Sequence, residues 1–334
     1  MSTSKDAPSA GQVPLLEVRD LKTHFTIDEI TVKAVDGVSF TLNEGDTLGI
    51  VGESGSGKSV TAASIMGVLP RRSKIVGGQI LYRGIDLVAL ESDVWRKMRG
   101  KKFAMVVQDP RASLDPVFSV GNQLREVVTG DEAEKRIVET LRLLAISRPE
   151  EVYRSYPHQL SGGMNQRVVI AMAVLPEPDL LIADEPTTAL DVTVQAQILA
   201  LLKRVQQQRK MTLILISHDL AVIASVSTHI LIMYGGRAME YGPVKEIFTN
   251  PRHPYTEALL ASIPRLDGPK TELRMIPGQP MDTRKSFRGC PFADRCTYVT
   301  DRCREEFPGQ TAHGPQHWAA CWQTAKVGQA VTAS

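Results

Sequence analysis

Apolar and polar residues alternate near the start of the chain, over residues 15–27 and again over 34–42. Alternation with a period of two, bounded by turn residues, predicts a pair of β-strands. The apolar run 46–52 predicts a buried strand, which passes through a glycine-rich loop into a helix from about Lys58 to Leu69.

Short apolar runs that predict further buried strands lie at 103–107, 180–183 and 212–216. Helical patterns separate them, at 133–145, 164–174 and 192–209. Buried strands that alternate with helices indicate an α/β domain layered on a mainly parallel sheet. The stretch from about 109 to 177 is mostly helical and interrupts the strand series, so we expect it to form a helical subdomain.

The pattern changes after Tyr241. Residues 251–334 are rich in proline and glycine, contain all four cysteines and show one clear helical pattern, at 255–263. We therefore predict a disordered tail at 1–14, an α/β domain at 15–250 and a C-terminal extension at 251–334. The tail lacks the hydrophobic core of a secretory signal, which indicates a cytosolic protein.

Composition narrows the class of protein. Of the 334 residues 43% are hydrophobic and 23% are charged, the usual balance of a globular protein with a full core. No apolar run approaches the ~18 residues of a membrane-spanning helix, so we expect any membrane association to pass through a partner. A net charge of +2 gives no argument for binding nucleic acid.

The glycine-rich loop reads Gly52-Glu-Ser-Gly-Ser-Gly-Lys58-Ser59 and matches the phosphate-binding pattern G-x-x-x-x-G-K-[ST]. Glycines let backbone N–H groups turn toward a phosphate, and the start of the helix adds the positive end of its dipole. We expect Lys58 to bind the β- and γ-phosphates and the Ser59 hydroxyl to bind Mg²⁺. A merely flexible loop is the alternative, and the strand–loop–helix context argues against it.

Two adjacent carboxylates, Asp184 and Glu185, follow the apolar run at 180–183. Acids at the end of a buried strand are unfavourable unless a charged group meets them, and Mg²⁺–ATP would be that group. We expect Asp184 to hold Mg²⁺, largely through water, and Glu185 to polarise the attacking water as general base. Acids at strand ends also cap helices, so this interpretation depends on the phosphate loop upstream.

The segment Leu160-Ser161-Gly162-Gly163-Met164 resembles the LSGGQ signature of ABC transporter ATP-binding subunits. The other motifs of that family stand in the expected order. Gln108 resembles its Q-loop glutamine, Ala189-Leu190-Asp191 its D-loop and His218 its switch histidine. The resemblance implies an ATPase with the fold of an ABC-type P-loop NTPase over residues 15–240.

In that family two ATPase domains meet head to tail, and each ATP lies between one phosphate loop and the partner's signature. The first turn of the helix after Ser161 would supply a second anion site. The resemblance makes Glu185, His218 and Gln108 catalytic, with His218 contacting the γ-phosphate, and makes Ser59, Gln108 and Asp184 the Mg²⁺ ligands. The residues expected to bind nucleotide are Phe25, Gly52, Ser54, Gly55, Ser56, Gly57, Lys58, Ser59, Val60, Ser161, Gly162, Gly163 and Asp191. Phe25 would stack on adenine, although ordinary strand packing explains it equally well.

Residues 108–118, 253–260 and the cysteine-bearing tail resemble the oligopeptide/dipeptide importer subfamily. This implies ATP-driven uptake of peptides or related small solutes, from the cytoplasmic face of the inner membrane. The implied partners are a second, non-identical ATPase subunit, two permeases and, indirectly, a substrate-binding protein. Met164 replaces the usual signature glutamine. Asn165 stands where this branch often has arginine, so we expect a weaker polar contact there.

Other classes fit less well. A soluble ABC ATPase acting on DNA or ribosomes would carry long coiled coils or two ATPase domains, and neither pattern occurs here. The segments and the cysteine-bearing tail that resemble peptide importers argue against an exporter ATPase, but only by resemblance. A non-enzymatic nucleotide-binding module would not need Lys58, Asp184, Glu185 and His218 together. The transported substrate stays open, because in this family the ATPase does not touch it.

All four cysteines, Cys290, Cys296, Cys303 and Cys321, lie in the extension. In a reducing cytosol such clustering indicates a metal site rather than disulfides, with four free thiols as the alternative. Their spacing matches neither the usual zinc knuckle nor the ferredoxin patterns, so it leaves Zn²⁺ and a 4Fe–4S cluster open. Resemblance to the peptide-importer tail implies a 4Fe–4S cluster with a structural role.

Overall fold

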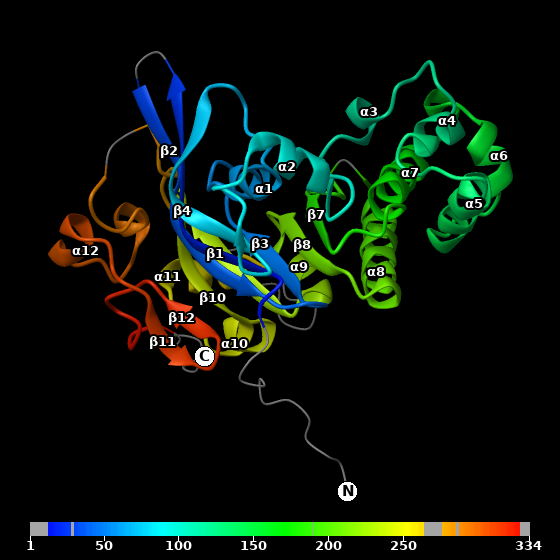
Figure 1. Ribbon diagram of the computed structural model, residues 1–334. Coiled ribbons are helices and arrows are strands. Elements are labelled where there is room, and N and C mark those ends of the chain that lie inside the picture. Colours follow the sequence, from blue (N-terminus) through cyan, green and yellow to red (C-terminus); the bar gives the residue numbers. More distant parts are fainter. Residues whose placement is uncertain (1–12, 28–29, 189, 264–275, 285–286, 328–334) are drawn as a thin grey trace, which may run out of the picture.

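Two β-sheets organise the chain in the computed structural model, which describes residues 13–27, 30–188, 190–263, 276–284 and 287–327 (Figure 1). Residues 1–12 of the predicted tail lie outside these ranges. Within them, no helix is both long and apolar enough to cross a membrane.

The smaller sheet is antiparallel and has the strand order β2-β1-β4-β5. The predicted pair of strands at the start of the chain is confirmed, with Leu16 opposite Leu42. Alternate side chains of β2, such as Val38 and Phe40, are buried, which is the origin of the period of two. The strands are β1 (Leu16–Ile27), β2 (Ile30–Leu42), β4 (Ser73–Tyr82) and β5 (Ile85–Asp86).

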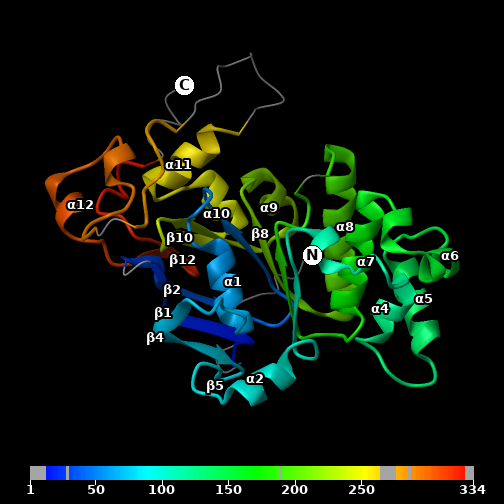
Figure 2. The same cartoon turned by 90° about the horizontal axis from the view of Figure 1, so that it is seen from above.

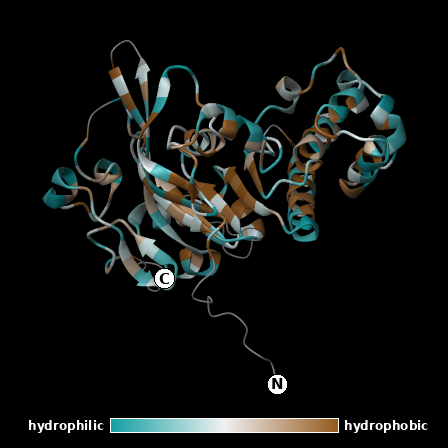
Figure 3. Cartoon of the chain, in the orientation of Figure 1, coloured by the Kyte–Doolittle hydropathy of each residue, from teal (hydrophilic) through white to brown (hydrophobic). Residues whose placement is uncertain are grey.

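The larger sheet has the order β11-β12-β10-β9-β3-β8-β7-β6. Strands β9, β3, β8, β7 and β6 are parallel, and the remaining pairings are antiparallel. Every residue of β3, β7 and β8 is buried, and hydrophobic residues concentrate on these central strands (Figure 3). The strands are β3 (Thr47–Val51), β6 (Phe103–Val106), β7 (Leu180–Asp184), β8 (Thr212–Ser217), β9 (His229–Tyr234), β10 (Arg237–Pro243), β11 (Thr311–Gly314) and β12 (His317–Ala319).

One hydrophobic core lies on each face of this sheet. Ile50 and Ile65 belong to the core shared with α1 and the smaller sheet, whereas Leu213 and Leu202 belong to the core shared with the helical arm. Burial on both faces explains why the central strands are continuous apolar runs. Because these strands are parallel, their carboxyl ends meet at one edge, where ligands bind in open α/β sheets.

The predicted helical stretch forms an arm on one side of the sheets (Figures 1 and 2). It consists of α3 (Pro110–Ser113), α4 (Val120–Arg125), α5 (Ala133–Leu143), α6 (Pro149–Arg154), the 3₁₀ turn η1 (Pro157–Gln159) and α7 (Gly162–Val174). The other helices are α1 (Lys58–Met66), α2 (Ser92–Met98), α8 (Val192–Arg209), α9 (Leu220–Val226), α10 (Val244–Thr249), α11 (Pro254–Ala261), η2 (Ala293–Arg295) and α12 (Asp301–Glu305).

The C-terminal region contains more regular structure than the sequence indicates. Besides the expected helix, α11, it forms α12 and the hairpin β11–β12, and β12 pairs with β10, placing Ala319 opposite Glu240. These strands are too short to leave a periodic pattern. A buried polar contact, with His317 Nε2 2.9 Å from Glu240 Oε1, also puts polar residues at core positions, where the sequence pattern leads one to expect apolar ones. The end of the chain therefore extends the main sheet.

Candidate functional site

The glycine-rich loop occupies the carboxyl end of β3 and leads into α1. Gly57 caps α1 with φ +99, and a Cβ atom on it would lie 2.3 Å from the carbonyl oxygen of Ala34. A Cβ on Gly52 would lie 2.1 Å from the carbonyl oxygen of Met233. Both positions exclude a side chain, so the backbone there can pass close to neighbouring strands and present its N–H groups.

Lys58 is buried above this loop, with 5% of its surface exposed. Its Nζ donates hydrogen bonds to the carbonyl oxygens of Gly52, at 2.8 Å, and Glu53, at 3.0 Å. Burial lowers the pKa of Lys58, while nearby carboxylates, chiefly Glu185 and Asp184, act to raise it. A buried ammonium held by neutral carbonyls is a ready partner for a phosphate, since a charged acceptor would bind it more strongly.

Asp184 ends β7 next to the loop and is 8% exposed. Burial raises the pKa of its carboxyl group, and a hydrogen bond with Ser59 opposes the shift. Among the described residues its Oδ1 atom has no hydrogen-bond partner. An unpartnered buried carboxylate oxygen beside a serine hydroxyl fits a hard divalent cation such as Mg²⁺, which prefers oxygen ligands.

Glu185 is held by three side chains from different elements. Gln108 Nε2 donates to its Oε2 at 3.1 Å, Thr188 Oγ1 donates to the same atom at 2.9 Å, and His218 Nδ1 lies 3.5 Å from Oε1. Its backbone has φ +46, a strained value for a residue with a side chain and one that clusters at functional sites. The fold thus gathers the three predicted catalytic residues, Glu185, Gln108 and His218, and adds Thr188, which the sequence analysis missed.

The signature segment opens α7 in the helical arm. Ser161 caps this helix, and its Oγ accepts a hydrogen bond from Met164 N at 3.3 Å. Gly163 packs against α8, where a Cβ atom would meet Val194 at 2.9 Å. Asn165 is buried, and its Nδ2 donates to the carbonyl oxygen of Pro157 at 3.0 Å, which ties α7 to η1. Figure 1 places α7 and α1 on opposite sides of β7 and β8, and Figure 2 likewise shows β8 between the two helices.

Two other predicted nucleotide-binding residues, Asp191 and Phe25, make local contacts in this structure. Asp191 caps α8, its Oδ1 accepting from Val194 N at 2.9 Å. Phe25 is half-buried in β1, opposite Val32 and Ser73. Ala189 lies outside the described residues. Stacking of Phe25 on adenine and contact of Asp191 with a partner stay predictions.

The four cysteines are free thiols that line one small cavity together with residues of α11 and the chain end. Cys290 N donates to Cys303 O at 2.7 Å, which joins two of the segments that carry them. Burial raises the pKa of Cys290 to about 12 and that of Cys321 to about 11. In the described part of the chain, no three His, Cys, Asp or Glu side chains form a group that could hold a metal ion.

Two family models match the chain, one for an ABC transporter over residues 35–188 and one for the C-terminal region of oligopeptide/dipeptide transporters over 239–303. The dipeptide transport ATP-binding protein DppD of Bacillus subtilis is 48% identical over 315 residues, covering 92% of this chain and 94% of the relative. The oligopeptide transport ATP-binding protein OppD of Salmonella typhimurium is 44% identical over 327 residues, covering 96% and 97%.

Solved structures are similar as well. A dimeric ATP-binding cassette in a post-hydrolysis state, bound to ADP and Pi, aligns with a TM-score of 0.61 and 27% identity over 69% of this chain and 98% of its own. The structure of cbiO1 from Clostridium perfringens, part of an ABC transporter complex, aligns with a TM-score of 0.62 and 28% identity, over 70% and 90%.

Proposed function

This chain belongs to the family of ABC transporter ATP-binding proteins, and on that premise we propose how its residues work. It binds and hydrolyses ATP and powers the import of peptides or related small solutes. The observation that carries this reading is the convergence of buried Lys58, Asp184 and the Gln108–Glu185–His218 group at one edge of the parallel sheet.

In the proposed mechanism, Lys58 exchanges its bonds to two loop carbonyls for bonds to the β- and γ-phosphates. Ser59 and Asp184 would hold Mg²⁺, with Gln108 as a further ligand, and the bound ion would neutralise charge on the phosphate oxygens. Glu185 accepts a proton from the attacking water. Thr188 and Gln108 orient its carboxylate, and the exposed His218 is free to meet the γ-phosphate.

Each ATP would be shared between two chains, because α7 and α1 of one chain lie on opposite sides of the central strands. The family resemblance favours a non-identical ATPase as the second subunit. Two permeases and, indirectly, a substrate-binding protein complete the proposed assembly. We place the chain peripherally at the cytoplasmic face of the inner membrane, docked on the permeases.

Substitution at Ser161 tests this sharing in a complex that contains this chain and its partner ATPase. When Lys58→Ala leaves only the partner's phosphate loop active, Ser161→Arg should reduce the remaining hydrolysis roughly tenfold or more, since it places a bulky cation at the anion-binding helix start. When the partner's phosphate loop is disabled instead, Ser161→Arg should have little effect. Ser119→Arg, at the N-cap of α4, is the matched control. Equal loss in both backgrounds would contradict the shared site, and an active complex with two copies of this chain would contradict the non-identical partner.

We further propose that Cys290, Cys296, Cys303 and Cys321 hold a 4Fe–4S cluster, with Zn²⁺ as the alternative. Supporting this, all four thiols line one cavity although they come from separate segments, Cys303 from α12 and the others from loops. Because no group of three His, Cys, Asp or Glu side chains that could hold a metal ion is found among the described residues, the proposal rests on the shared cavity and on the family resemblance. Because ATP-driven transport needs no redox step, the proposed role is structural.

A further inference from the structure

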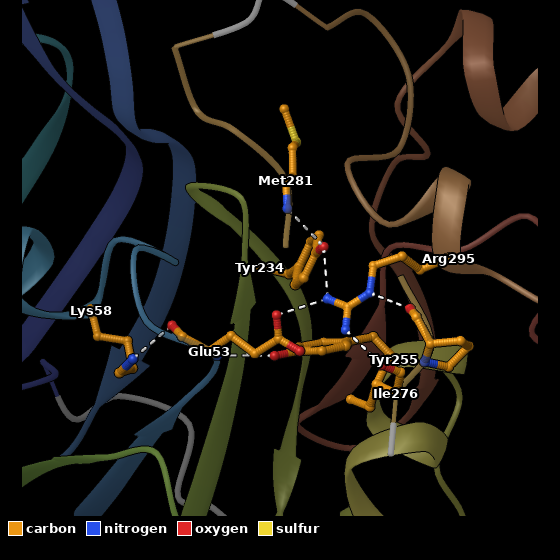
Figure 4. A network of polar contacts seen from close by, with 8 residues as sticks. Glu53, Lys58, Tyr234, Tyr255, Ile276, Met281 and Arg295 are labelled. Atoms are coloured by element: carbon orange, nitrogen blue, oxygen red, sulfur yellow. Dashed lines mark hydrogen bonds and ion pairs between the residues drawn. The ribbon is translucent and has the colours of Figure 1, made fainter. Parts of the chain in front are cut away.

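The phosphate loop has a direct contact with the C-terminal region through Glu53. The Glu53 carboxylate points toward Arg295, while its main-chain carbonyl accepts from Lys58 (Figure 4). Arg295 Nη1 donates to Glu53 Oε2 at 2.7 Å. The Arg295 side chain is 6% exposed and that of Glu53 is 22% exposed, so the pair is shielded from bulk water. An ion pair with this burial is screened far less than one at the surface.

Arg295 is fixed in place by further contacts on every side. Its Nε donates to Pro277 O at 2.8 Å and its Nη2 to Ile276 O at 3.2 Å. Nη1 also lies 3.1 Å from the hydroxyl of Tyr234, a residue of β9 (Figure 4). Four hydrogen bonds from one rigid plane thus reach acceptors in three segments, a geometry that lysine could not reproduce.

The loop backbone is held from the same side. Glu53 N donates to the hydroxyl of Tyr255, a fully buried residue of α11, at 3.0 Å. The C-terminal region therefore contacts this one loop residue at both its main chain and its side chain. Neither contact follows from the phosphate-binding pattern, in which the second position can be any residue.

The charge of Glu53 explains why such a contact matters. A carboxylate in a phosphate loop repels the phosphates of an incoming nucleotide and competes for the lysine that should bind them. Glu53 is near enough to Lys58 that its charge acts on the Lys58 pKa. Pairing with Arg295 draws this carboxylate away from Lys58 and neutralises it.

We propose that Arg295 is a positioning residue for ATP binding, which pairs with Glu53 to keep the phosphate loop open to an anion. The inference rests on the proposed function of the loop as the ATP site. Arg295 ends η2, directly before Cys296, and the Ala293 N–H of the same turn donates to Cys290 O at 3.0 Å. The turn that carries Arg295 is therefore framed by two of the cysteines that line the cavity.

Equilibrium titration of the full chain with a fluorescent ATP analogue and Mg²⁺ tests the proposal. Arg295→Met keeps the apolar stem and removes the charge, and should weaken binding roughly tenfold. The double variant Arg295→Met/Glu53→Gln should recover most of this loss, because no uncompensated carboxylate remains. Arg295→Lys should be intermediate, because it keeps the charge but not the planar set of donors. Arg284→Ala, which removes an exposed ion pair with Asp282, is the matched control and should bind normally.

The outcomes separate this inference from the proposed function. If Lys58→Ala weakens binding while Arg295→Met does not, the inference is wrong and the ATP site stands. If Lys58→Ala itself binds normally, the proposed function of the loop is wrong. Equal weakening in Arg295→Met and the double variant would mean that Arg295 acts through folding rather than through the charge of Glu53, and would overturn the proposal. Should Arg295→Met fail to fold, Tyr255→Phe, which removes the other loop contact, must weaken binding about threefold for the proposal to survive.

Discussion

The phosphate loop and the cysteine cavity hold their binding groups in opposite ways. The loop is a continuous segment between β3 and α1, and its shape is set by backbone packing against neighbouring strands. The cavity collects four side chains from separate segments between residues 290 and 321, namely three loops and the short helix α12. A site built from backbone between regular elements keeps its shape without its ligand. A site built from side chains on short turns depends more on what connects them.

The phosphate site and the cysteine cavity also differ in their charges: the first already carries charged groups, and the second does not. The phosphate site already carries a buried ammonium, Lys58, and a carboxylate, Asp184, whose Oδ1 has no partner among the described residues. In the cavity, burial raises the pKa of Cys290 to about 12 and that of Cys321 to about 11, so these thiols keep their protons. A metal must displace those protons before it can bind. The comparison teaches that the nucleotide site is prepared in advance, whereas the metal site proposed for the cavity would be completed only by its occupant.

Glu185→Gln should give the largest effect, and it alters chemistry without altering the shape of the prepared site. Loss of a positioned general base should reduce hydrolysis by ~10²–10⁴ while ATP binding is kept. The measurement is phosphate release by the assembled transporter, together with nucleotide titration. Glu44→Gln, at an exposed ion pair with Arg83, is the control. Hydrolysis by Glu185→Gln at the parent rate would show that another group is the base.

Lys58→Ala should have the second-largest effect, because it removes the positive charge that the phosphate loop offers to ATP. Loss of a buried charge-assisted contact should weaken ATP binding about 30-fold. The backbone glycines are unchanged, so circular dichroism and the thermal unfolding midpoint should stay close to those of the parent. Unchanged affinity would contradict the assignment of Lys58 to the phosphates, whereas unfolding would contradict a loop that keeps its own shape.

Cys303→Ser should affect the cysteine cavity more than the nucleotide site. It replaces a buried thiol with a nearly equal volume and removes one proposed ligand. After anaerobic purification we expect the parent to contain iron and absorb near ~400 nm, and the variant to lose both. Removing the cross-link should lower the free energy of unfolding by about 2 kcal/mol. ATP affinity should fall less than in Lys58→Ala, because the effect reaches the loop only indirectly, through the contacts of Arg295 and Tyr255 with Glu53.

Thr300→Val is the control for this experiment, since it removes the hydroxyl 3.2 Å from Cys303 Sγ and leaves every thiol in place. It should keep the metal. A colourless parent with stoichiometric zinc would replace the cluster with Zn²⁺. A parent that contains neither metal would mean four free thiols, and the thermal unfolding of Cys303→Ser should then match that of the parent.

Most of the α/β domain could be predicted from local pattern. Continuous apolar runs became β3, β7 and β8, and the helical pattern at 192–209 became α8 with the same bounds. The fold also brings Gln108 and His218 to Glu185, as the family motifs imply. Thr188 was missed, because a threonine in a loop gives no signal until its hydroxyl is seen to meet a carboxylate.

The sequence by itself determined the phosphate loop, the paired acids and the family, because those groups act within a few residues of one another and leave a local pattern. Only the tertiary structure decided that β12 extends the main sheet and that Arg295 reaches Glu53. Both contacts join residues far apart in the chain, and Glu53 and Arg295 each look like an ordinary polar surface residue in their own segments. These residues become buried only after the chain has folded and excluded water around them, and the role of their contacts depends on that burial.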